Sequence, residues 1–489
     1  MNKLYILVFL IAIFSCERPS TEGSSSLIDD KEKNIVSEVD TLNVVPKPND
    51  DKNHKTKVKF YLENTLSMYG YLPEKKIINT GFRNAVNDLI ITSKTNYNKE
   101  NLDFFLINNT TAKSVSIKDN LDGIDAKTLG RFYKKGRGTS DFDKLFEKIL
   151  LDWKEDEIIV FIADFIYSPK DTDVESGLIR LRQNITRKFQ SIPNSETLTT
   201  SVLHLESEFE GTYYDIDNNN RVGIKKRPYY VFIIGDGDTV DKYTKGVVPK
   251  LKRYNLKNKY QITPSDIQIN EFSVLPFTLN KGQFSISSTK GKTVTIENSL
   301  SQGASVQLAA SINLGDIPIS DDYLTDLTNY SFNSKKIKIL DIGEIEGNQI
   351  RLKDGTLKSI NPSDISRTEN STHVLLLSLP NTYNGNIEIT LNKNIPKWID
   401  NVSIKDGEDD RDIETNALKQ SQTFGFKNII EGIYEAQKTT GDSNKYFQIT
   451  LKVNQEKASS GLGTIVGWFV VLLILFIIGI IIYKNKQRK

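Results

Sequence analysis

The chain has 489 residues, and its 64 lysines and arginines against 62 aspartates and glutamates give a formal net charge of +2. This length predicts two or three domains, and the near-neutral charge without a basic segment gives no support for nucleic-acid binding. With three histidines and one cysteine, the chain cannot form a zinc site of four cysteines or of paired cysteines and histidines. Any bound metal must therefore be held mainly by oxygen ligands.

The amino-terminal segment resembles a bacterial lipoprotein signal peptide. A basic start at Lys3 is followed by the apolar run 4–14 and then by Ser15 and Cys16. In such signals the cysteine becomes the lipidated first residue after cleavage. We expect residues 1–16 to be this signal, with an uncleaved anchor or a plain secretory signal as alternatives. Residues 17–56 are rich in Ser, Asp, Glu, Lys and Asn, which predicts a flexible tether.

The next region, residues 57–256, alternates between predicted strands and helices. Strands are expected at 58–62, 102–107, 158–163, 199–205 and 229–234, and helices at 76–91, 141–153, 174–189 and 241–254. The run 158–163 is continuously apolar, as in a strand covered on both faces. This order predicts an α/β domain with a doubly wound, largely parallel, Rossmann-like sheet. In such sheets a ligand site lies beyond the carboxyl ends of the strands.

Oxygen-bearing side chains occur at three points along that expected edge. One group alternates after the first strand, one hydroxyl precedes the second helix, and one aspartate follows the apolar strand. They are Glu63, Thr65 and Ser67, then Thr139 with Ser140 as an equally reachable hydroxyl, then Asp164. Carboxylates and hydroxyls of this kind are ligands for a hard divalent cation such as Mg²⁺.

This three-part pattern resembles the metal-ion-dependent adhesion site of von Willebrand factor A domains, whose first loop reads Asp-x-Ser-x-Ser. The resemblance covers residues 57–254. It implies an A-type fold that binds a protein partner through a bridging ion, Mg²⁺ or else Ca²⁺ or Mn²⁺. Glu63 and Thr65 depart from the family's residues, and the added methylene of Glu63 suits Mg²⁺ less well than Ca²⁺. The alternative is a metal-free A-type fold in which Thr65 and Ser67 cap the following turn.

Two further acidic segments are candidates for calcium-binding loops. Asp215, Asp217 and Asn219 begin like a calcium loop, but Asn220 stands where glycine is needed and Lys226 where glutamate is needed. A polar hairpin turn is the favoured interpretation there. The segment 406–412 is interpreted as a solvated acidic loop, with loose calcium binding as the alternative.

The carboxyl-terminal half has a different pattern of apolar and polar residues. Residues 261–455 form short alternating runs separated by Gly, Asn, Asp and Pro, which predicts a β-rich, sandwich-like domain. A helix at 425–436 is expected to pack on one sheet. Residues 464–483 carry no charge and match the ~20 residues that cross a bilayer. The basic tail 484–489 then lies in the cytoplasm, which places the bulk of the chain in the cell envelope, outside the cytoplasmic membrane.

Together these patterns predict an envelope-anchored protein-binding module that uses its A-type domain. A second hypothesis is a structural or assembly subunit of a membrane complex, with a metal-free A-like domain. An enzyme is not expected, because His54, His204 and His373 stand beside no candidate nucleophile. A metal-dependent hydrolase that uses Glu63 and Asp164 is the remaining alternative.

Overall fold

The computed structural model describes residues 56–73, 80–97, 99–109, 112–114, 121, 124–132, 140–168, 173–286, 291–297, 304–440, 444–456 and 462–487. These residues belong to one compact unit, Asp50–Lys489. The predicted signal peptide with Cys16, the predicted tether up to residue 55, and Thr139 lie outside the described residues.

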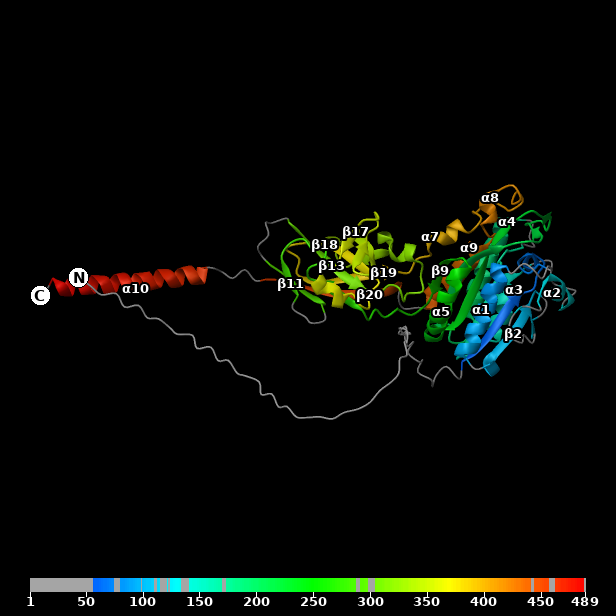
Figure 1. Cartoon of the computed structure of the whole chain (residues 1–489), viewed down its shortest axis with the longest axis horizontal. Helices are drawn as coiled ribbons and strands as arrows, with labels where there is room; N and C mark the ends of the chain where they lie inside the picture. Colours follow the sequence, from blue (N-terminus) through cyan, green and yellow to red (C-terminus); the bar gives the residue numbers. More distant parts are fainter. Residues whose placement is uncertain are drawn as a thin grey trace, which may run out of the picture. The chain divides into compact units, whose positions relative to one another are not determined.

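The amino-terminal part is built on a seven-stranded sheet in the order β3-β2-β1-β4-β8-β5-β9. Figure 1 labels two of its strands, β2 and β9. Its strands are β1 (Lys57–Glu63), β2 (Leu102–Ile107), β3 (Ala112–Ser114), β4 (Glu157–Ala163), β5 (Leu198–Glu208), β8 (Lys226–Asp236) and β9 (Leu256–Ile262). All seven side chains of β4 are buried, as its continuous apolar run predicts. Because β9 belongs to this sheet, the sheet continues to residue 262.

The expectation of a largely parallel sheet is wrong. Only β1 with β2 and β1 with β4 pair in parallel, and the other four pairings are antiparallel. For β8 the cause is the connection from β5, which contains the short strands β6 (Tyr213–Tyr214) and β7 (Asn220–Arg221) and no helix. Strands joined in this hairpin fashion must run in opposite directions. The coarser expectation of a mixed α/β fold is confirmed.

Helices cover both faces of the sheet. On one face lie α1 (Gly81–Asn96) and α5 (Gly237–Leu251), whose apolar side chains share a core with Val160 of β4. On the other face lie α3 (Phe142–Leu151) and α4 (Val174–Gln190), which share a core with Phe161. Helix α1 begins at Gly81, later than predicted, because the Thr80 hydroxyl accepts the backbone N–H of Arg83 and caps it. The short helix α2 (Ala126–Phe132) lies between β3 and α3 in the sequence.

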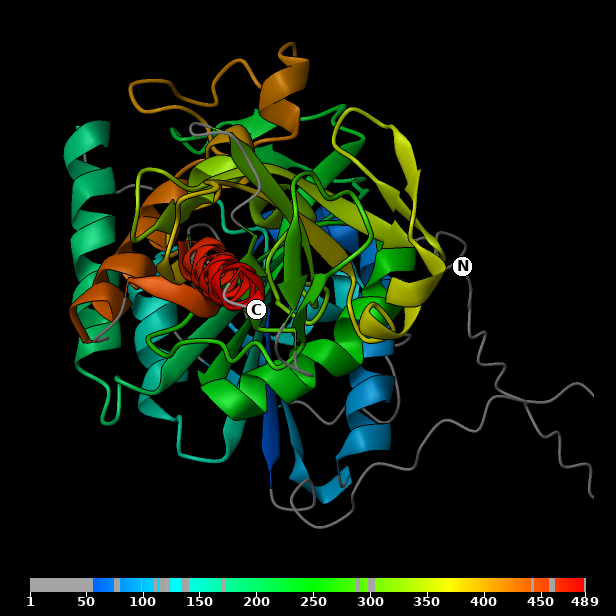
Figure 2. The same ribbon diagram turned by 90° about the vertical axis from the view of Figure 1, so that its left-hand side faces the viewer.

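The late helix α9 (Phe426–Thr440) packs against this first sheet, although in sequence it lies within the β-rich region, before its last strand. Figures 1 and 2 show it beside α4. A Cβ on Gly432 would lie 2.7 Å from the carbonyl oxygen of Arg182, so glycine is what allows the two helices to approach. At the start of α9, the ring of Phe426 stacks on Tyr230 of β8 with centroids 3.8 Å apart. The helix expected at 425–436 therefore packs on the seven-stranded sheet.

The β-rich part contains two further sheets, one of six strands and one of five. The first consists of β10 (Phe272–Leu275), β13 (Ser305–Ile312), β18 (His373–Pro380), β15 (Lys338–Glu346), β16 (Gln349–Arg351) and β17 (Leu357–Ser359). The second consists of β11 (Phe284–Ile286), β12 (Thr293–Ile296), β20 (Lys445–Gln455), β19 (Gly385–Asn392) and β14 (Tyr330–Phe332). Leu308 of the first and Ile389 of the second belong to one buried cluster, as in a sandwich. Short helices α6 (Asp321–Leu324), α7 (Lys397–Asn401) and α8 (Ala417–Gln420) lie in the connections.

The last helix, α10 (Leu462–Lys486), has an apolar surface. Its large apolar side chains from Val471 to Tyr483 are exposed, with Phe476 at 70%. Among the side chains that the structure describes, no helix is both long and apolar enough to qualify as a membrane span.

Candidate functional site

The candidate site forms where two neighbouring parallel strands end. Leu62 of β1 stands opposite Ile162 of β4, so Glu63 and Asp164 leave the sheet at the same edge. After Glu63 the chain enters the 3-10 turn η1 (Ser67–Tyr71), and Tyr71 anchors this turn. The Tyr71 hydroxyl donates to the carbonyl oxygen of Pro228, and its ring packs against Phe82.

Hydrogen bonds join two of the three polar segments at this edge, and the third lies beside them, since the charge of Asp164 acts on Glu63. The Ser140 hydroxyl, just before α3, donates to Glu63 Oε1 at 2.6 Å. The Thr65 hydroxyl donates to the same oxygen at 3.2 Å, and its oxygen lies 3.1 Å from Ser67 Oγ. Asp164 Oδ1 accepts the backbone N–H of Ile166 at 3.1 Å. The predicted residues Glu63, Thr65, Ser67 and Asp164 thus meet as expected, and Ser140 supplies the hydroxyl from the second loop.

The two carboxyl groups of the site are buried and electrostatically linked. Glu63 and Asp164 are both 0% exposed. Burial raises the pKa of Glu63 well above its usual range, and the charge of Asp164 raises that pKa further. Burial also raises the pKa of Asp164, against a lowering effect of the Ser67 hydroxyl. Since two like charges repel strongly in a dry environment, burial and the neighbouring Asp164 both favour the protonated form of Glu63 in the metal-free protein.

One oxygen of each carboxyl group lacks a hydrogen-bond partner among the described residues. Glu63 Oε2 and Asp164 Oδ2 are buried and have no hydrogen-bond partner among the described residues, a situation that costs about 1–3 kcal/mol for each such group. The neighbouring side-chain atoms that could bind a metal are all oxygens, which suits a hard cation such as Mg²⁺ or Ca²⁺. The described chain contains no group of three or more His, Cys, Asp or Glu that could hold a metal. This site offers two carboxyl groups, so the three hydroxyls would have to supply the remaining protein ligands of a cation.

Sequence reasoning missed Arg227, which lies in β8 and is 1% exposed. Its Nη1 donates to the carbonyl oxygens of Lys419 and Gln420 at 3.1 and 2.8 Å, and its guanidinium lies 4.7 Å from the ring centre of Tyr213. The positive charge of Arg227 lowers the pKa of Asp164. In the sequence it follows two lysines and looks like part of a solvated turn, so no local signal marks it.

The acidic segments have structural roles. Asp215 accepts the N–H groups of Asp217 and Asn219 at 3.0 and 2.8 Å and pairs with Arg221 at 2.6 Å, which confirms the polar hairpin. Asp410 is 1% exposed and accepts from the backbone N–H of Ile216 at 2.8 Å. The interpretation of 406–412 as a solvated loop is therefore wrong at Asp410, because this residue docks on the β6–β7 hairpin.

The described histidines lie in the cores. His204 is stacked between the rings of Tyr230 and Trp398, at 5.2 and 5.7 Å, and burial lowers its pKa to about 4. His373 is 5% exposed, and burial lowers its pKa as well. Both are neutral at physiological pH. His54 lies outside the described residues.

Searches for related proteins found no match among protein-family models, curated proteins or solved structures. A functional interpretation of this chain therefore depends on the geometry of the site formed by Glu63, Thr65, Ser67, Ser140 and Asp164.

Proposed function

We propose that the chain is an envelope-anchored protein-binding module whose A-type domain holds a divalent cation beyond β1 and β4. The observation that carries this proposal is the meeting of two buried carboxyl groups from different strands, each with one oxygen that lacks a partner among the described residues. Such a pair is unfavourable by itself and becomes favourable when a cation neutralises it.

Glu63 Oε2 and Asp164 Oδ2 would hold the ion, with the hydroxyls of Thr65, Ser67 and Ser140 beside them. A bound divalent cation supplies a positive charge to which a carboxylate of a partner protein can bind. Two carboxylates balance the charge of a divalent ion, so the partner carboxylate would bind by taking a coordination position that these side chains leave open.

A proton takes the place of the ion in the metal-free protein. Glu63 has a raised pKa, so metal uptake must release its proton, and metal affinity should increase with pH. Ser67, at 8%, is the most exposed of the five side chains. Partner binding therefore involves a rearrangement of η1 or of the loop before α3, since a carboxylate must reach the ion.

We further propose that the chain is held at the bacterial cytoplasmic membrane, with its bulk on the outer side, by lipid at Cys16 and by the helix at 464–483. The support is the charge-free sequence of that segment, the basic tail that follows it, and the exposed apolar side chains between Val471 and Tyr483. An apolar surface of this kind needs a lipid or protein environment.

The competing proposal is a structural subunit of a membrane complex with a metal-free A-like domain. Its support is that Ser140 and Thr65 already satisfy Glu63 Oε1 and that the site is covered. A proton shared by the acid pair would then be a permanent part of the fold.

Affinity capture from detergent-solubilised membranes separates the two proposals. The bait is the full chain, because α9 completes the face of the first sheet and a fragment of residues 57–254 would lack it. A cation-bridged partner is captured with Mg²⁺ and lost with a chelator or with Asp164→Asn. A structural subunit keeps its partners under both changes and loses them when 464–489 is deleted. Asp322→Asn, at an exposed position, serves as a charge-matched control.

A further inference from the structure

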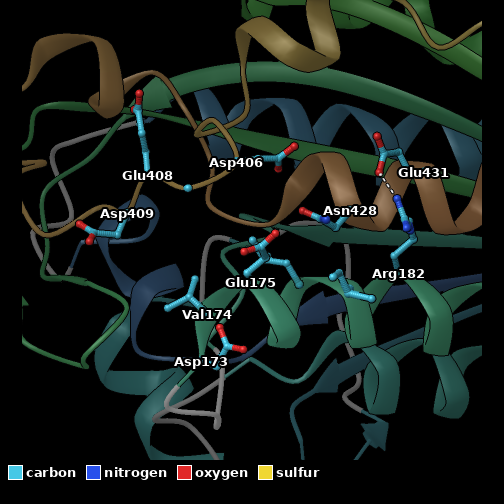
Figure 3. A pocket seen from close by; sticks show the side chains of 12 residues that line it. Asp173, Val174, Glu175, Arg182, Asp406, Glu408, Asp409, Asn428 and Glu431 are labelled. Carbon is cyan, nitrogen blue, oxygen red and sulfur yellow. Dashed lines mark hydrogen bonds and ion pairs between the residues drawn. The ribbon is translucent and has the colours of Figure 1, made fainter.

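A pocket of about 460 Å³ lies away from the edge site, between the start of α4, the loop 406–409 and α9 (Figure 3). Its size is within the range of small-molecule sites. Its charged lining residues are acidic, apart from Arg182. They are Asp173, Glu175, Asp406, Glu408, Asp409 and Glu431.

Nearby cations neutralise only part of this charge. Arg182 pairs with Glu431 at 3.2 Å, and Lys427 lies 3.9 Å from both Asp406 and Glu431. Asp409 pairs with Arg411. Within the described residues, Glu175 and Glu408 take part in no ion pair. The pocket therefore keeps a net negative charge, which a hollow surface concentrates.

An amide at the base of the pocket also lacks a partner. Asn428 of α9 is 9% exposed and lines the pocket, and Figure 3 shows its amide pointing from the helix into the cavity. Its side chain makes no hydrogen bond among the described residues. Its carbonyl oxygen is therefore available to accept a hydrogen bond from a cationic N–H group of a ligand.

The remaining lining is aliphatic. Val174, Leu178 and Ile179 come from the first turns of α4, where Leu178 packs in a small cluster with Ile404 and Phe424. Ile179 is 42% exposed, so it offers apolar surface to a ligand. Long cationic side chains bury their methylene groups on surfaces of this kind and keep the charged end among polar groups.

We propose that this pocket binds an alkylammonium group, which is an ammonium carried on a chain of methylenes. Glu175 provides the counter-charge, Asn428 accepts a hydrogen bond from the ammonium, and the aliphatic side chains of α4 contact the methylenes. Two sources offer this chemistry, a lysine side chain of a protein and a free alkyl diamine. The pocket shares no residue with the edge site, so this inference is independent of metal binding.

The test is calorimetric titration of the full chain in detergent, at constant ionic strength, with cadaverine and with Nα-acetyl-lysine amide. The expected result is binding of at least one probe, at least tenfold weaker binding in Glu175→Gln and in Asn428→Leu, and no change in Glu369→Gln, an exposed control. Tighter binding of the lysine derivative identifies a protein side chain as the source, and tighter binding of cadaverine identifies a free diamine.

Three outcomes would overturn the proposal. They are no binding of either probe at concentrations on the order of 10 mM, equal binding of the uncharged diol analogue of cadaverine, and equal affinity in all variants. Urea unfolding midpoints of the variants show that a lost signal does not come from misfolding. The polar-to-apolar change at Asn428 is the most exposed to that risk, and Asn428→Asp, which keeps the acceptor, should retain binding.

Discussion

Replacing Asp164 with asparagine should stabilise the metal-free protein and at the same time abolish its stabilisation by Mg²⁺. Asp164 is 0% exposed, and its Oδ1 accepts the N–H of Ile166 at 3.1 Å. The amide oxygen of asparagine can keep that bond. The amide nitrogen takes the place of Oδ2, which has no partner among the described residues, and it brings a donor toward the second acid of the site.

The expected size follows from these contacts. An unsatisfied buried group costs about 1–3 kcal/mol, so the variant should gain that much free energy of unfolding without metal. The gain should increase with pH, because the wild-type protein must ionise Glu63, whose pKa is raised by burial and by the charge of Asp164. Saturating Mg²⁺ should offset most or all of this gain, because only the wild type binds the ion, and this loss distinguishes the effect from an ordinary packing change.

Urea unfolding of the full chain measures the difference in unfolding free energy between variant and wild type, without and with Mg²⁺. Chelated samples at pH 6 and pH 8 give the metal-free comparison, and saturating Mg²⁺ gives the other. At about 100 times its dissociation constant, a ligand specific for the native state adds ~2.7 kcal/mol, which the wild type should gain and Asp164→Asn should not. The control Asp322→Asn removes an exposed charge and should stay within about 0.5 kcal/mol of wild type. The reasoning fails if Asp164→Asn destabilises the metal-free protein and Mg²⁺ stabilises both proteins equally.

Three further changes test the surroundings of the acid pair. Ser140→Ala removes the 2.6 Å donor to Glu63 and should cost about 1–2 kcal/mol in urea unfolding; Ser140→Thr should restore most of it, and a neutral alanine variant would contradict the role. The pKa of Glu63 is higher in the folded than in the unfolded chain, so the metal-free protein should lose stability as pH rises from about 4.3 through that raised pKa. Glu63→Gln should make the unfolding free energy less dependent on pH. A wild-type unfolding free energy that increases with pH would refute this prediction. Arg227→Met withdraws the donors from the carbonyl oxygens of residues 419 and 420 and should speed amide hydrogen exchange around α8, whereas unchanged exchange would show that this docking does not depend on the guanidinium.

The local periodicity of the sequence predicts most elements of the first sheet, because each strand or helix carries its own apolar pattern. The closeness of Glu63 and Asp164 is predictable for a related reason. Glu63 and Asp164 come directly after strands, and neighbouring parallel strands end at one edge. The direction of β8 depended on something else, the absence of a helix between it and β5. The missing helix is visible in the sequence and indicates a hairpin, but the alternation of strands and helices elsewhere in the domain favours a parallel sheet.

Other features were decided by contacts between distant segments. The apolar face of α9 is compatible with any sheet, and its place beside α4 depends on the close approach at Gly432. Asp410 looks like one acid in a solvated run until the hairpin at Ile216 binds it. Arg227 is buried because the chain near residue 420 supplies carbonyl acceptors. No pattern within a short window contains these partners.

Calorimetric titration of Mg²⁺ into the full-length protein, in two buffers of different ionisation enthalpy, tests the cation site most directly. The two buffers together count the protons released for each ion bound. The account predicts binding at one site with net proton release from Glu63, and no binding to Asp164→Ala. Absence of binding to the wild type, or equal binding to Asp164→Ala, would contradict it.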